Sequence, residues 1–414
     1  MRYDVVVAGG GPAGSSAAWR AATAGARVLV VDKAVFPRDK PCGDGLTPRA
    51  VRSIADIGLG NELKAFHRVD ILRVHGAGRV LEFGWPSSEG FPPYGYVVAR
   101  TDLDELMLRH AQAAGAEVWE GATVRGPVTR DGVVTGVVIR REGRDVEVAA
   151  GSVVAADGAS STLARTVGLV RDPRYPFGIA IRAHFPSSRP DDNAIESHLE
   201  IRDPDGTQLP GYGWVFPMGG GRINVGCGLL NTYPRWREVN TAQLMEALLA
   251  SLPASWELPP LDHLRATGQL KGWRLPMAVS TNPPWVPGCL AVGDAAGVVN
   301  PFNGEGISEA VESGVAGAEA ILQRLERGGP QDLSLYERRL DELWGPYYRL
   351  GRTFARLIGR PKAMRLAIDA GMRFPPVMSF AFKVLANLYR EQGGTAGDRT
   401  VRAMVRIAST VRLG

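Results

Sequence analysis

Three glycine turns, two of them with an adjacent aspartate, could together hold a nucleotide cofactor, and the first lies at the N-terminus. Residues 9–14 read GGGPAG and fit the pattern GxGxxG, and Asp32 follows 18 positions after Gly14. In such a turn Gly9 permits the tight bend, Gly11 lets backbone N–H groups approach a diphosphate, and Gly14 allows a helix to pack closely. The carboxylate of Asp32 can accept hydrogen bonds from a ribose and would repel a 2′-phosphate, which disfavours NADP at this site.

Two segments near residue 300 favour a flavin over a nicotinamide dinucleotide. The segment 290–297 reads LAVGDAAG, and 301–307 reads PFNGEGI. Asp294 can accept a hydrogen bond from a ribityl hydroxyl, and a helix beginning near Ile307 directs its positive end towards the flavin N1 and C2 carbonyl. The Asp-Gly pair at 157–158 offers a third contact. One such pair is typical of an ordinary turn, but three after apolar strands favour FAD.

These motifs need strands that end at the turns and helices that begin there. Apolar runs predict buried strands at 3–8, 27–32, 151–156 and 288–292, and helical spacing predicts helices at 15–23, 101–114 and 307–325. A strand, a glycine turn, a helix and a second strand within about 30 residues form a βαβ unit with parallel strands. Antiparallel strands are expected at 179–185, 195–202, 211–217 and 222–228, where apolar and polar residues alternate. The pattern predicts a nucleotide-binding α/β domain built from non-contiguous segments, with a β-rich domain inserted.

Composition excludes several other classes of protein. The 414 residues are 45% hydrophobic and 22% charged, with a mean hydropathy of -0.07, and no run approaches the roughly 20 apolar residues of a spanning helix. The net charge of +5 is too small to indicate nucleic acid binding. The three cysteines are widely spaced, so we expect neither a disulfide framework nor a zinc site, and we expect a reducing, cytoplasmic location.

Positive charge is concentrated at the C-terminal end. Residues 345–414 contain thirteen Lys and Arg against three acidic residues, a net +10, so the rest of the chain carries −5. Basic residues between 349 and 365 are interspersed with apolar ones, and an apolar stretch at 374–382 follows. This composition suits peripheral docking at the anionic inner face of the cell membrane. The alternative is a helical cap with a solvated basic face.

Several longer segments are more specific than the glycine fingerprint. They are FPRDKPCGDGLTPRA (36–50), ARTDLDELM (99–107), VVAADGASS (153–161), LPGYGWVFP (209–217), GRINVGCG (221–228) and VGDAAGVVNPFNGEGI (292–307). Together with the N-terminal VVVAGGGPAGSSAA, they resemble flavoproteins of the geranylgeranyl reductase family, in the larger class that includes para-hydroxybenzoate hydroxylase. Within that family they are similar to actinobacterial reductases of isoprenyl double bonds. The resemblance covers residues 1 to about 325.

The resemblance implies an α/β fold with an FAD-binding, Rossmann-like domain of the para-hydroxybenzoate hydroxylase type. We expect this discontinuous domain at 1–75, 97–175 and 272–330, an antiparallel β substrate domain at 76–96 and 176–271, and a helical basic region at 331–414. The implied cofactor is FAD. The implied reaction is saturation of a double bond in an isoprenoid chain, such as the menaquinone side chain or a geranylgeranyl group, by hydride from flavin N5 with coupled protonation.

The motifs and the resemblance nominate specific site residues. Expected to contact the cofactor are Gly9, Gly11, Ala13, Gly14, Asp32, Lys33, Cys42, Gly43, Arg100, Asp157, Gly158, Gly293, Asp294, Pro301, Gly304, Gly306 and Ile307. Arg49 is a further candidate by resemblance. Expected to act in catalysis are Cys42, Tyr212 and Trp214. The alternative for Cys42 is a small buried side chain without a role, which is usual for a free cysteine.

An unpolarised alkene needs proton delivery and a dry, apolar pocket. Candidate lining residues are Tyr94, Tyr96, Tyr212, Trp214, Phe216 and Phe302, although each could be ordinary core. Cys227 and Cys289 are expected in the core. The histidines show no metal-ligand spacing, and His198 with Glu200 fits a solvated strand face better than a metal site. We therefore expect no metal.

The same residues leave two alternative functions open and indicate the partners of the protein. A flavin monooxygenase of an aromatic or polyketide ring shares the fold and FAD motifs, and a non-catalytic isoprenoid-binding protein is the second alternative. A halogenase is disfavoured because GYGWVFP replaces its signature. Gly219–Gly221 precedes a strand pattern and not a helix, so no second dinucleotide site is expected. Electrons then come from an external donor, NADPH or a redox protein, to reduce an isoprenoid lipid substrate.

Overall fold

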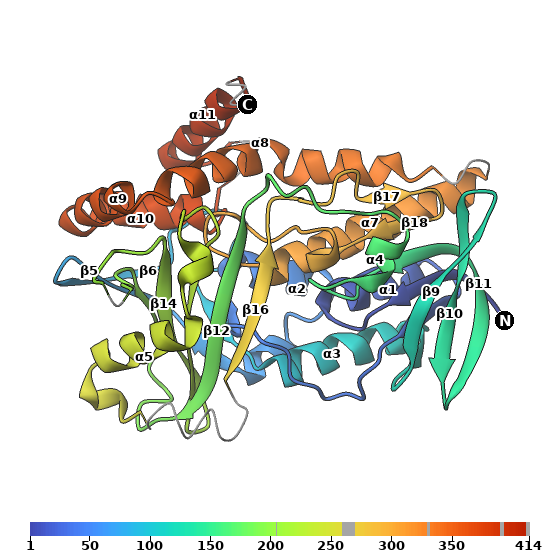
Figure 1. Cartoon of the computed structure of the whole chain (residues 1–414), viewed down its shortest axis with the longest axis horizontal. Coiled ribbons are helices and arrows are strands. Elements are labelled where there is room, and N and C mark those ends of the chain that lie inside the picture. Colours follow the sequence, from blue (N-terminus) through green and yellow to red (C-terminus); the bar gives the residue numbers. More distant parts are fainter. Residues whose placement is uncertain (204, 259–269, 329–331, 390–392, 411–414) are drawn as a thin grey trace.

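The computed structural model describes residues 1–203, 205–258, 270–328, 332–389 and 393–410. Two large sheets lie towards opposite ends of an elongated molecule, and long C-terminal helices run along one side of both (Figure 1). The N-terminal strand lies at the end that carries β9–β11, whereas α9 and α10 lie at the opposite end. The candidate site lies between the two sheets, as described below.

The first sheet is the predicted nucleotide-binding sheet, with the order β17-β18-β11-β1-β2-β8 and with β9 and β10 added as a meander on β11. Strands β18, β11, β1, β2 and β8 are mutually parallel. Its strands are β1 (Arg2–Ala8), β2 (Val28–Val31), β8 (Glu117–Trp119), β9 (Thr123–Arg130), β10 (Val133–Arg141), β11 (Arg144–Ala155), β17 (Trp285–Val286) and β18 (Cys289–Ala291). The predicted apolar strands therefore form one parallel core.

Three helices pack together next to this sheet because small residues let them approach. They are α1 (Pro12–Thr23), α3 (Arg100–Ala113) and α7 (Ile307–Arg327), and α1 contacts both of the others. A Cβ atom at Gly314 of α7 would lie 2.3 Å from the carbonyl oxygen of Ala13, so only glycine permits this approach. The contact brings the start of α1, near residue 12, against a helix that begins 295 residues later. The short α4 (Thr162–Thr166) follows β11.

The second sheet has the order β16-β12-β15-β14-β13-β5-β6 and is antiparallel except for the parallel pair β13 and β5. Its strands are β5 (Ile71–Gly76), β6 (Arg79–Gly84), β12 (Phe177–Pro186), β13 (Ala194–His198), β14 (Gly211–Gly219), β15 (Arg222–Leu230) and β16 (Lys271–Pro276). Helix α5 (Thr241–Ser251) packs on β12 and β15. Strand pairing thus reaches from Ile71 to Pro276, a few residues beyond the predicted limits 76–96 and 176–271.

A small third sheet connects the two large ones. It consists of β3 (Gly45–Leu46), β7 (Gly95–Val97) and β4 (His67–Val69), with α2 (Pro48–Asp56) following β3. The predicted strand at 195–202 ends earlier, at His198, and the predicted strand at 151–156 is the end of a longer β-hairpin strand. Gly219–Gly221 forms the turn between β14 and β15, as predicted from the strand pattern that follows it.

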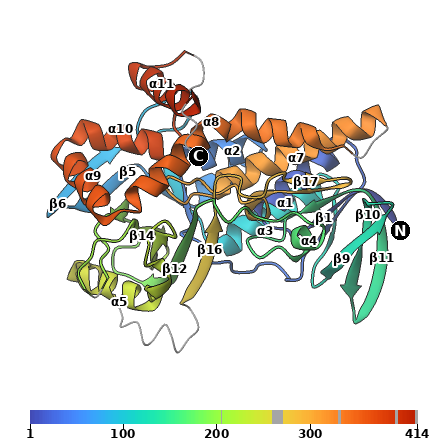
Figure 2. The ribbon, with the colours of Figure 1, turned by 45° about the horizontal axis from the view of Figure 1, so that its top comes forward.

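The basic C-terminal region is an integral part of the fold, which the charge count did not show. It contains α8 (Ser334–Ile358), α9 (Pro361–Arg373), α10 (Pro375–Leu385) and α11 (Ala396–Thr410). Fully buried tyrosines of α8 donate hydrogen bonds to backbone oxygens elsewhere: Tyr336 to Ala291 at 2.8 Å and Tyr348 to Val298 at 2.6 Å. Figure 2 shows α8 lying along α7 and leading to α9 and α10 beside β5 and β6. The helices described are all too short or too polar to cross a membrane.

Candidate active site

The glycine turn after β1 has the geometry expected of a diphosphate site. Gly9 has a φ of +110°, and a Cβ at Gly14 would lie 1.9 Å from the carbonyl oxygen of Gly9. Helix α1 begins after Gly11 without a side-chain cap, and a Cβ at Gly11 would meet nothing nearer than Arg38, at 3.4 Å. Gly11, Pro12 and Ala13 line a cavity. Among the described residues, no side chain caps the first N–H groups of α1, and they lie at a place where a diphosphate fits.

Asp32 braces this turn from the end of β2. Its Oδ2 accepts a hydrogen bond from the Gly10 N–H at 2.8 Å, and its Oδ1 accepts one from Ala34 at 2.9 Å. The carboxylate is buried and lies beside the cavity without lining it, and Lys33 next to it is exposed. The ribose contact of Asp32 and the cofactor contact of Lys33 stay predictions.

The motif at 157–158 differs from what we expected. The Asp157 carboxylate accepts hydrogen bonds from the backbone of Thr162 at 2.9 Å and Leu163 at 3.2 Å, and also from the hydroxyl of Ser161. It is therefore committed to the N-terminus of α4, and only Gly158 lines the cavity. At this motif the cavity is therefore lined by Gly158 and not by the Asp157 carboxylate.

The Gly293–Asp294 turn converges on the first one. A Cβ at Gly293 would lie 2.7 Å from the Cβ of Ala13, so the two turns touch although 280 residues separate them. The Asp294 carboxylate is on the cavity wall, 3.2 Å from the Lys40 ammonium, and the backbone oxygen of Asp294 accepts from Arg171 at 3.0 Å.

Two basic residues near these turns were not identified from the sequence. Arg38 lies beside Gly11 and is 2.8 Å from Asp104, and Lys40 lines the cavity next to Asp294. Both lie in the segment PRDK at residues 37–40, shortly before Cys42. These charged residues are next to a loop that the sequence had already nominated, and this position could have identified them as candidates. Positive charge beside a helix N-terminus strengthens its attraction for a phosphate.

Arg100 is buried in the cavity wall and is bound at both ends of its guanidinium. It makes two hydrogen bonds to Asp104, at 2.7 and 2.8 Å, and it contacts the Cys42 thiol. Burial alone would lower the pKa of Arg100, but the carboxylate of Asp104 and the thiol of Cys42 outweigh this effect and raise it. Arg100 thus remains charged and fixed in place. Arg49, by contrast, is not part of the cavity wall and pairs with Glu312 at 2.7 Å.

The loop that carries Cys42 is held against the second sheet by buried side chains. The Cys42 carbonyl oxygen accepts from Arg182 of β12 at 3.2 Å and from Asn224 of β15 at 2.8 Å. The same Asn224 amide donates to Asp44 at 2.8 Å and accepts from the Trp214 indole N–H at 2.8 Å through its oxygen. These bonds join the Cys42 loop to the second sheet and fix residues 42–44.

The Cys42 thiol is partly buried and is not in a disulfide. Burial raises its pKa, and the nearby Arg100 opposes that rise. The thiol is therefore protonated at neutral pH, which suits a proton donor better than a nucleophile. Cys227 and Cys289 are fully buried in the core as predicted, and burial raises the pKa of each to about 12.

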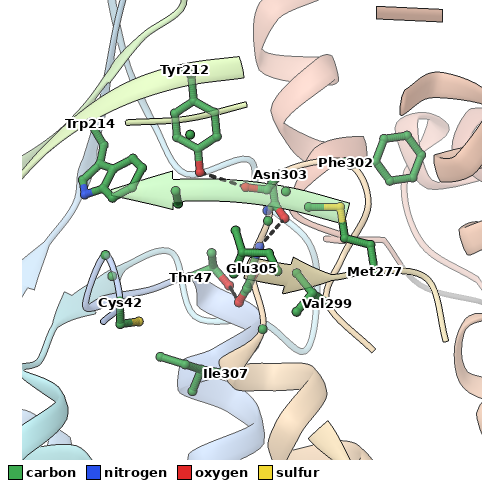
Figure 3. A pocket seen from close by; sticks show the side chains of 18 of the residues that line it. Cys42, Thr47, Tyr212, Trp214, Met277, Val299, Phe302, Asn303, Glu305 and Ile307 are labelled. Carbon is green, nitrogen blue, oxygen red and sulfur yellow. Dashed lines mark hydrogen bonds between the residues drawn. The ribbon is translucent and has the colours of Figure 1, made fainter. Parts of the chain in front are cut away.

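Aromatic residues of β14 form one wall of the cavity. Tyr212, Trp214 and Phe216 alternate along the strand and all line the cavity, with successive ring centroids 6.0 and 6.2 Å apart. Figure 3 shows Tyr212 and Trp214 on this wall. The Tyr212 hydroxyl donates to the backbone oxygen of Asn303 at 2.8 Å, and burial raises its pKa. Phe302 also lines the cavity, as predicted.

Tyr94 and Tyr96 do not line the cavity, contrary to expectation. Their rings contact each other edge to face, with centroids 5.6 Å apart, and the Arg68 guanidinium lies 4.1 Å from the Tyr94 centroid. They belong to the core beneath the small third sheet, which was the alternative for each aromatic residue. Nothing in the sequence distinguished them from the lining aromatics, because a core position and a cavity wall require the same apolar residues.

The loop before α7 closes the floor of the cavity. Pro301, Gly304, Gly306 and Ile307 all line it, and α7 begins after Gly306 without a side-chain cap. The first N–H groups of α7 therefore form a second open helix terminus. Two uncapped helix starts, one for a diphosphate and one for a pyrimidine carbonyl, fit the needs of FAD.

The cavity has a volume of about 410 Å³ and its wall is mainly apolar. The predicted residues that it brings together are Gly11, Ala13, Cys42, Gly43, Arg100, Gly158, Tyr212, Trp214, Gly293, Asp294, Pro301, Gly304, Gly306 and Ile307. Gly9, Gly14, Asp32, Lys33 and Asp157 lie outside its wall. Apolar side chains of the C-terminal helices extend it: Phe354 and Ile358 of α8, Met364 and Ile368 of α9, and Met378 and Phe382 of α10. We did not predict these six from the sequence.

A histidine and glutamate cluster lies on β5 and β13 of the second sheet. The potential ligand atoms of His75, Glu196 and His198 are within 4.8 Å of one another in the part of the chain that the structure describes. Glu196 is already bound by Arg73 at 2.8 Å and lies 3.1 Å from His198, so the cluster is an ion-pair network. Glu196, and not Glu200, is the partner of His198, because residues 196 and 198 lie on the same face of β13, whereas Glu200 lies beyond the end of that strand.

The glycine turn, the parallel sheet and the inserted antiparallel sheet define a flavoprotein of the para-hydroxybenzoate hydroxylase class. Residues 2–342 match the FAD binding domain family. The chain is 37% identical to the menaquinone reductase of Mycobacterium tuberculosis, over 93% of this chain and 91% of that one. It is 31% identical to the digeranylgeranylglycerophospholipid reductase of Thermoplasma volcanium, over 81% of this chain and 82% of that one.

A solved structure from Thermoplasma acidophilum, described as geranylgeranyl bacteriochlorophyll reductase-like, has a similar fold. It superposes with a TM-score of 0.79 at 26% identity and covers 98% of this chain and 99% of that one. The chain belongs to the geranylgeranyl reductase family of FAD-binding flavoproteins.

We predict that Arg38→Met weakens FAD binding about tenfold while the protein stays folded, since a charge beside the diphosphate site is lost. Fluorescence titration of apoprotein with FAD measures this. Arg20→Met is the matched control, because Arg20 lies in the last turn of helix α1, at the end away from Gly11 and the cavity. Equal affinity of the two variants would remove Arg38 from the cofactor site.

Proposed function

We propose that this protein is an FAD-dependent reductase that saturates a carbon–carbon double bond of an isoprenoid chain. The observation that carries the proposal is one apolar cavity that runs from two uncapped helix starts to the C-terminal helices. The polar end suits FAD, and the apolar end suits a hydrocarbon chain. The reductases that resemble this chain are named after menaquinone and digeranylgeranylglycerophospholipid, which agrees with a cavity that has a polar end and an apolar end. The menaquinone side chain is our first choice of substrate, and a geranylgeranyl group is the second.

The residues of the cavity have separate tasks in this proposal. Tyr212, Trp214 and the apolar helix residues exclude water and hold the chain of the substrate. Bound in reduced form, the cofactor supplies hydride. Cys42 keeps its thiol proton at neutral pH beside the fixed charge of Arg100, at a position in the wall where a substrate carbon can be protonated.

The electron donor and the substrate are external partners in this proposal. We propose NADPH or a redox protein as the donor, which meets the flavin without a stable nucleotide site of its own. Gly219–Gly221 supports this view, because it forms a strand-to-strand turn and opens no helix.

Product analysis separates this function from its alternatives. The reductase converts an isoprenyl double bond to a single bond under anaerobic conditions, with reduced flavin as the electron source and no oxygen atom in the product. Mass spectrometry of menaquinone incubated with photoreduced holoprotein tests this directly. Incorporation of oxygen in air would instead show a monooxygenase, and an isolated protein that never takes up FAD would show a non-catalytic isoprenoid-binding protein.

We predict that Cys42→Ala retains the visible absorbance of bound flavin but lowers turnover about 100-fold, which is the usual size of a general-acid contribution. Cys289→Ala is the control, because Cys289 is buried in the core of the first sheet, away from the cavity wall. Undiminished turnover of Cys42→Ala would exclude the thiol as a proton donor.

We also propose that α9 and α10 dock on an anionic bilayer, where an isoprenoid lipid resides. These two helices form a hairpin at one end of the molecule (Figures 1 and 2). Leu366, Phe374 and Val377 on it are 70%, 60% and 50% exposed. The exposed basic side chains Arg356, Arg360, Lys362, Arg365 and Arg373 lie on it or directly precede it.

The cavity supports this orientation. Ala367 of α9 lines the cavity and is itself exposed, so the apolar end of the cavity reaches the surface on the hairpin. A lipid chain can then enter from the bilayer without crossing water. We propose a location at the inner face of the cell membrane on the basis of the same basic residues.

We predict that the double variant Leu366→Glu/Phe374→Glu binds vesicles containing anionic lipid at least tenfold more weakly, because each buried apolar side chain contributes about 1.5–3 kcal/mol. Vesicle co-sedimentation measures the change. Val170→Glu is the control, since Val170 is 62% exposed outside the hairpin. Unchanged binding of the double variant, or equal binding to neutral vesicles, would contradict docking through this surface.

A further inference from the structure

A group of buried carboxyl groups lies directly beneath the cavity, at the start of α7. Glu305 lines the cavity and Glu309 is fully buried one turn further along. Figure 3 shows Glu305 between Thr47 and Asn303 in the middle of the site. Neither Glu305 nor Glu309 has an ion-pair partner among the described residues, and each has one buried oxygen, Oε2 and Oε1 respectively, without a hydrogen-bond partner. The functions assigned above do not use them.

The contacts between these groups favour an additional proton. The Ser308 hydroxyl oxygen lies 3.0 Å from Glu305 Oε1 and 2.8 Å from Glu309 Oε2. A serine hydroxyl has one hydrogen, so it can donate fully to only one of the two oxygens. The second contact is a hydrogen bond only if that carboxyl is protonated and donates to Ser308. Thr47 already donates to Glu305 Oε1 at 2.5 Å, which leaves Glu309 as the favoured site of the proton.

The charges around the pair agree with one retained proton. The charge of Arg49 of α2 acts on both glutamates, but Arg49 is 2.7 Å from Glu312 and is paired with it. Tyr347 and Tyr348 of α8 and Tyr212 of β14 also face the pair, and burial raises the pKa of each phenol, so all three stay neutral. Burial raises the pKa of both glutamates, and the charges of Glu305 and Glu312 add to the rise at Glu309. Arg49 and the α7 N-terminus oppose it only in part.

We propose that Glu305, Ser308 and Glu309 form a proton-holding unit that keeps one proton at neutral pH and releases it to the cavity through Glu305. The order of the groups is Glu309, Ser308, Glu305 and then the cavity wall, so a proton can pass along existing hydrogen bonds. This unit is a second acid next to the substrate, distinct from the Cys42 thiol, which lies on another loop.

The proton has a defined place in the reaction, and this part rests on the proposed function. Saturation of a double bond adds one hydride and one proton. The hydride comes from the reduced cofactor, which is oxidised, and the proton comes to the site from the unit. The unit is then left with two carboxylates, and it recovers one proton from solvent before the next turnover.

Infrared spectroscopy of the holoprotein tests the proton itself and needs no substrate. We expect a C=O stretching band of a protonated carboxylic acid at pH 7 that shifts in D₂O and disappears in Glu305→Gln/Glu309→Gln. Glu319→Gln is the control, because Glu319 is on the exposed side of the same helix α7 and pairs with Arg20. If the wild-type protein has no such band, or if the double variant retains it, the proposal is wrong.

Turnover then tests the use of the proton. Glu305→Gln cannot release a proton to the cavity, so we expect turnover to fall about 100-fold with the flavin spectrum unchanged. In Glu309→Gln, Glu305 is the one carboxyl left in the unit and ionises without a second carboxylate beside it, so the decline of turnover at high pH should move to lower pH. A pH profile of Glu309→Gln identical to that of the wild type would overturn the proposal. A band that behaves as expected in a protein that reduces no prenyl bond would contradict the proposed function and leave the proton-holding unit standing.

Discussion

The hydrogen bonds that fix the loop at residues 42–44 are the constraint on which the site depends. Arg182 and Asn224 come from the inserted sheet, yet they bind the backbone of a loop that leads away from the cofactor sheet. Because these bonds are buried, loss of any partner would leave an unsatisfied polar group at a cost of about 1–3 kcal/mol. The loop therefore has one position, and the Cys42 thiol, Arg100 and Trp214 are held in one arrangement around the cavity.

The same network explains why two chemically different regions can share one cavity. The polar end is made by backbone N–H groups at the starts of α1 and α7, which need no ionised side chain. The apolar end is made by β14 and by α8–α10, which also cover the inserted sheet. Water has few polar partners between these ends, so acids such as Cys42 and the Glu305 unit keep their protons. The basic helices thus complete the site, and their charge lies on the outer surface.

Much of the fold could be predicted from the sequence because its signals are local. The apolar runs at β1, β2 and β18 and the glycine turn after β1 specify a parallel sheet, since each depends on neighbouring residues. The alternation along β14 also showed that Tyr212, Trp214 and Phe216 share a face. The ends of β13 and β5 could not be predicted, because strand pairing at a sheet margin depends on partners distant in sequence.

Tertiary structure decided which of the nominated residues meet. The sequence by itself determined that three glycine turns exist, two of them with an adjacent aspartate, and that each follows a strand. Only the packing of α7 on α1 placed Gly293 against Ala13, and only the start of α4 drew the Asp157 carboxylate away from the cavity. Tertiary packing also decided which helix residues form the apolar wall and which contacts join Glu305, Ser308 and Glu309. Propensity and turn chemistry act within a few residues, whereas a cavity is enclosed by side chains whose positions depend on the packing of the whole chain.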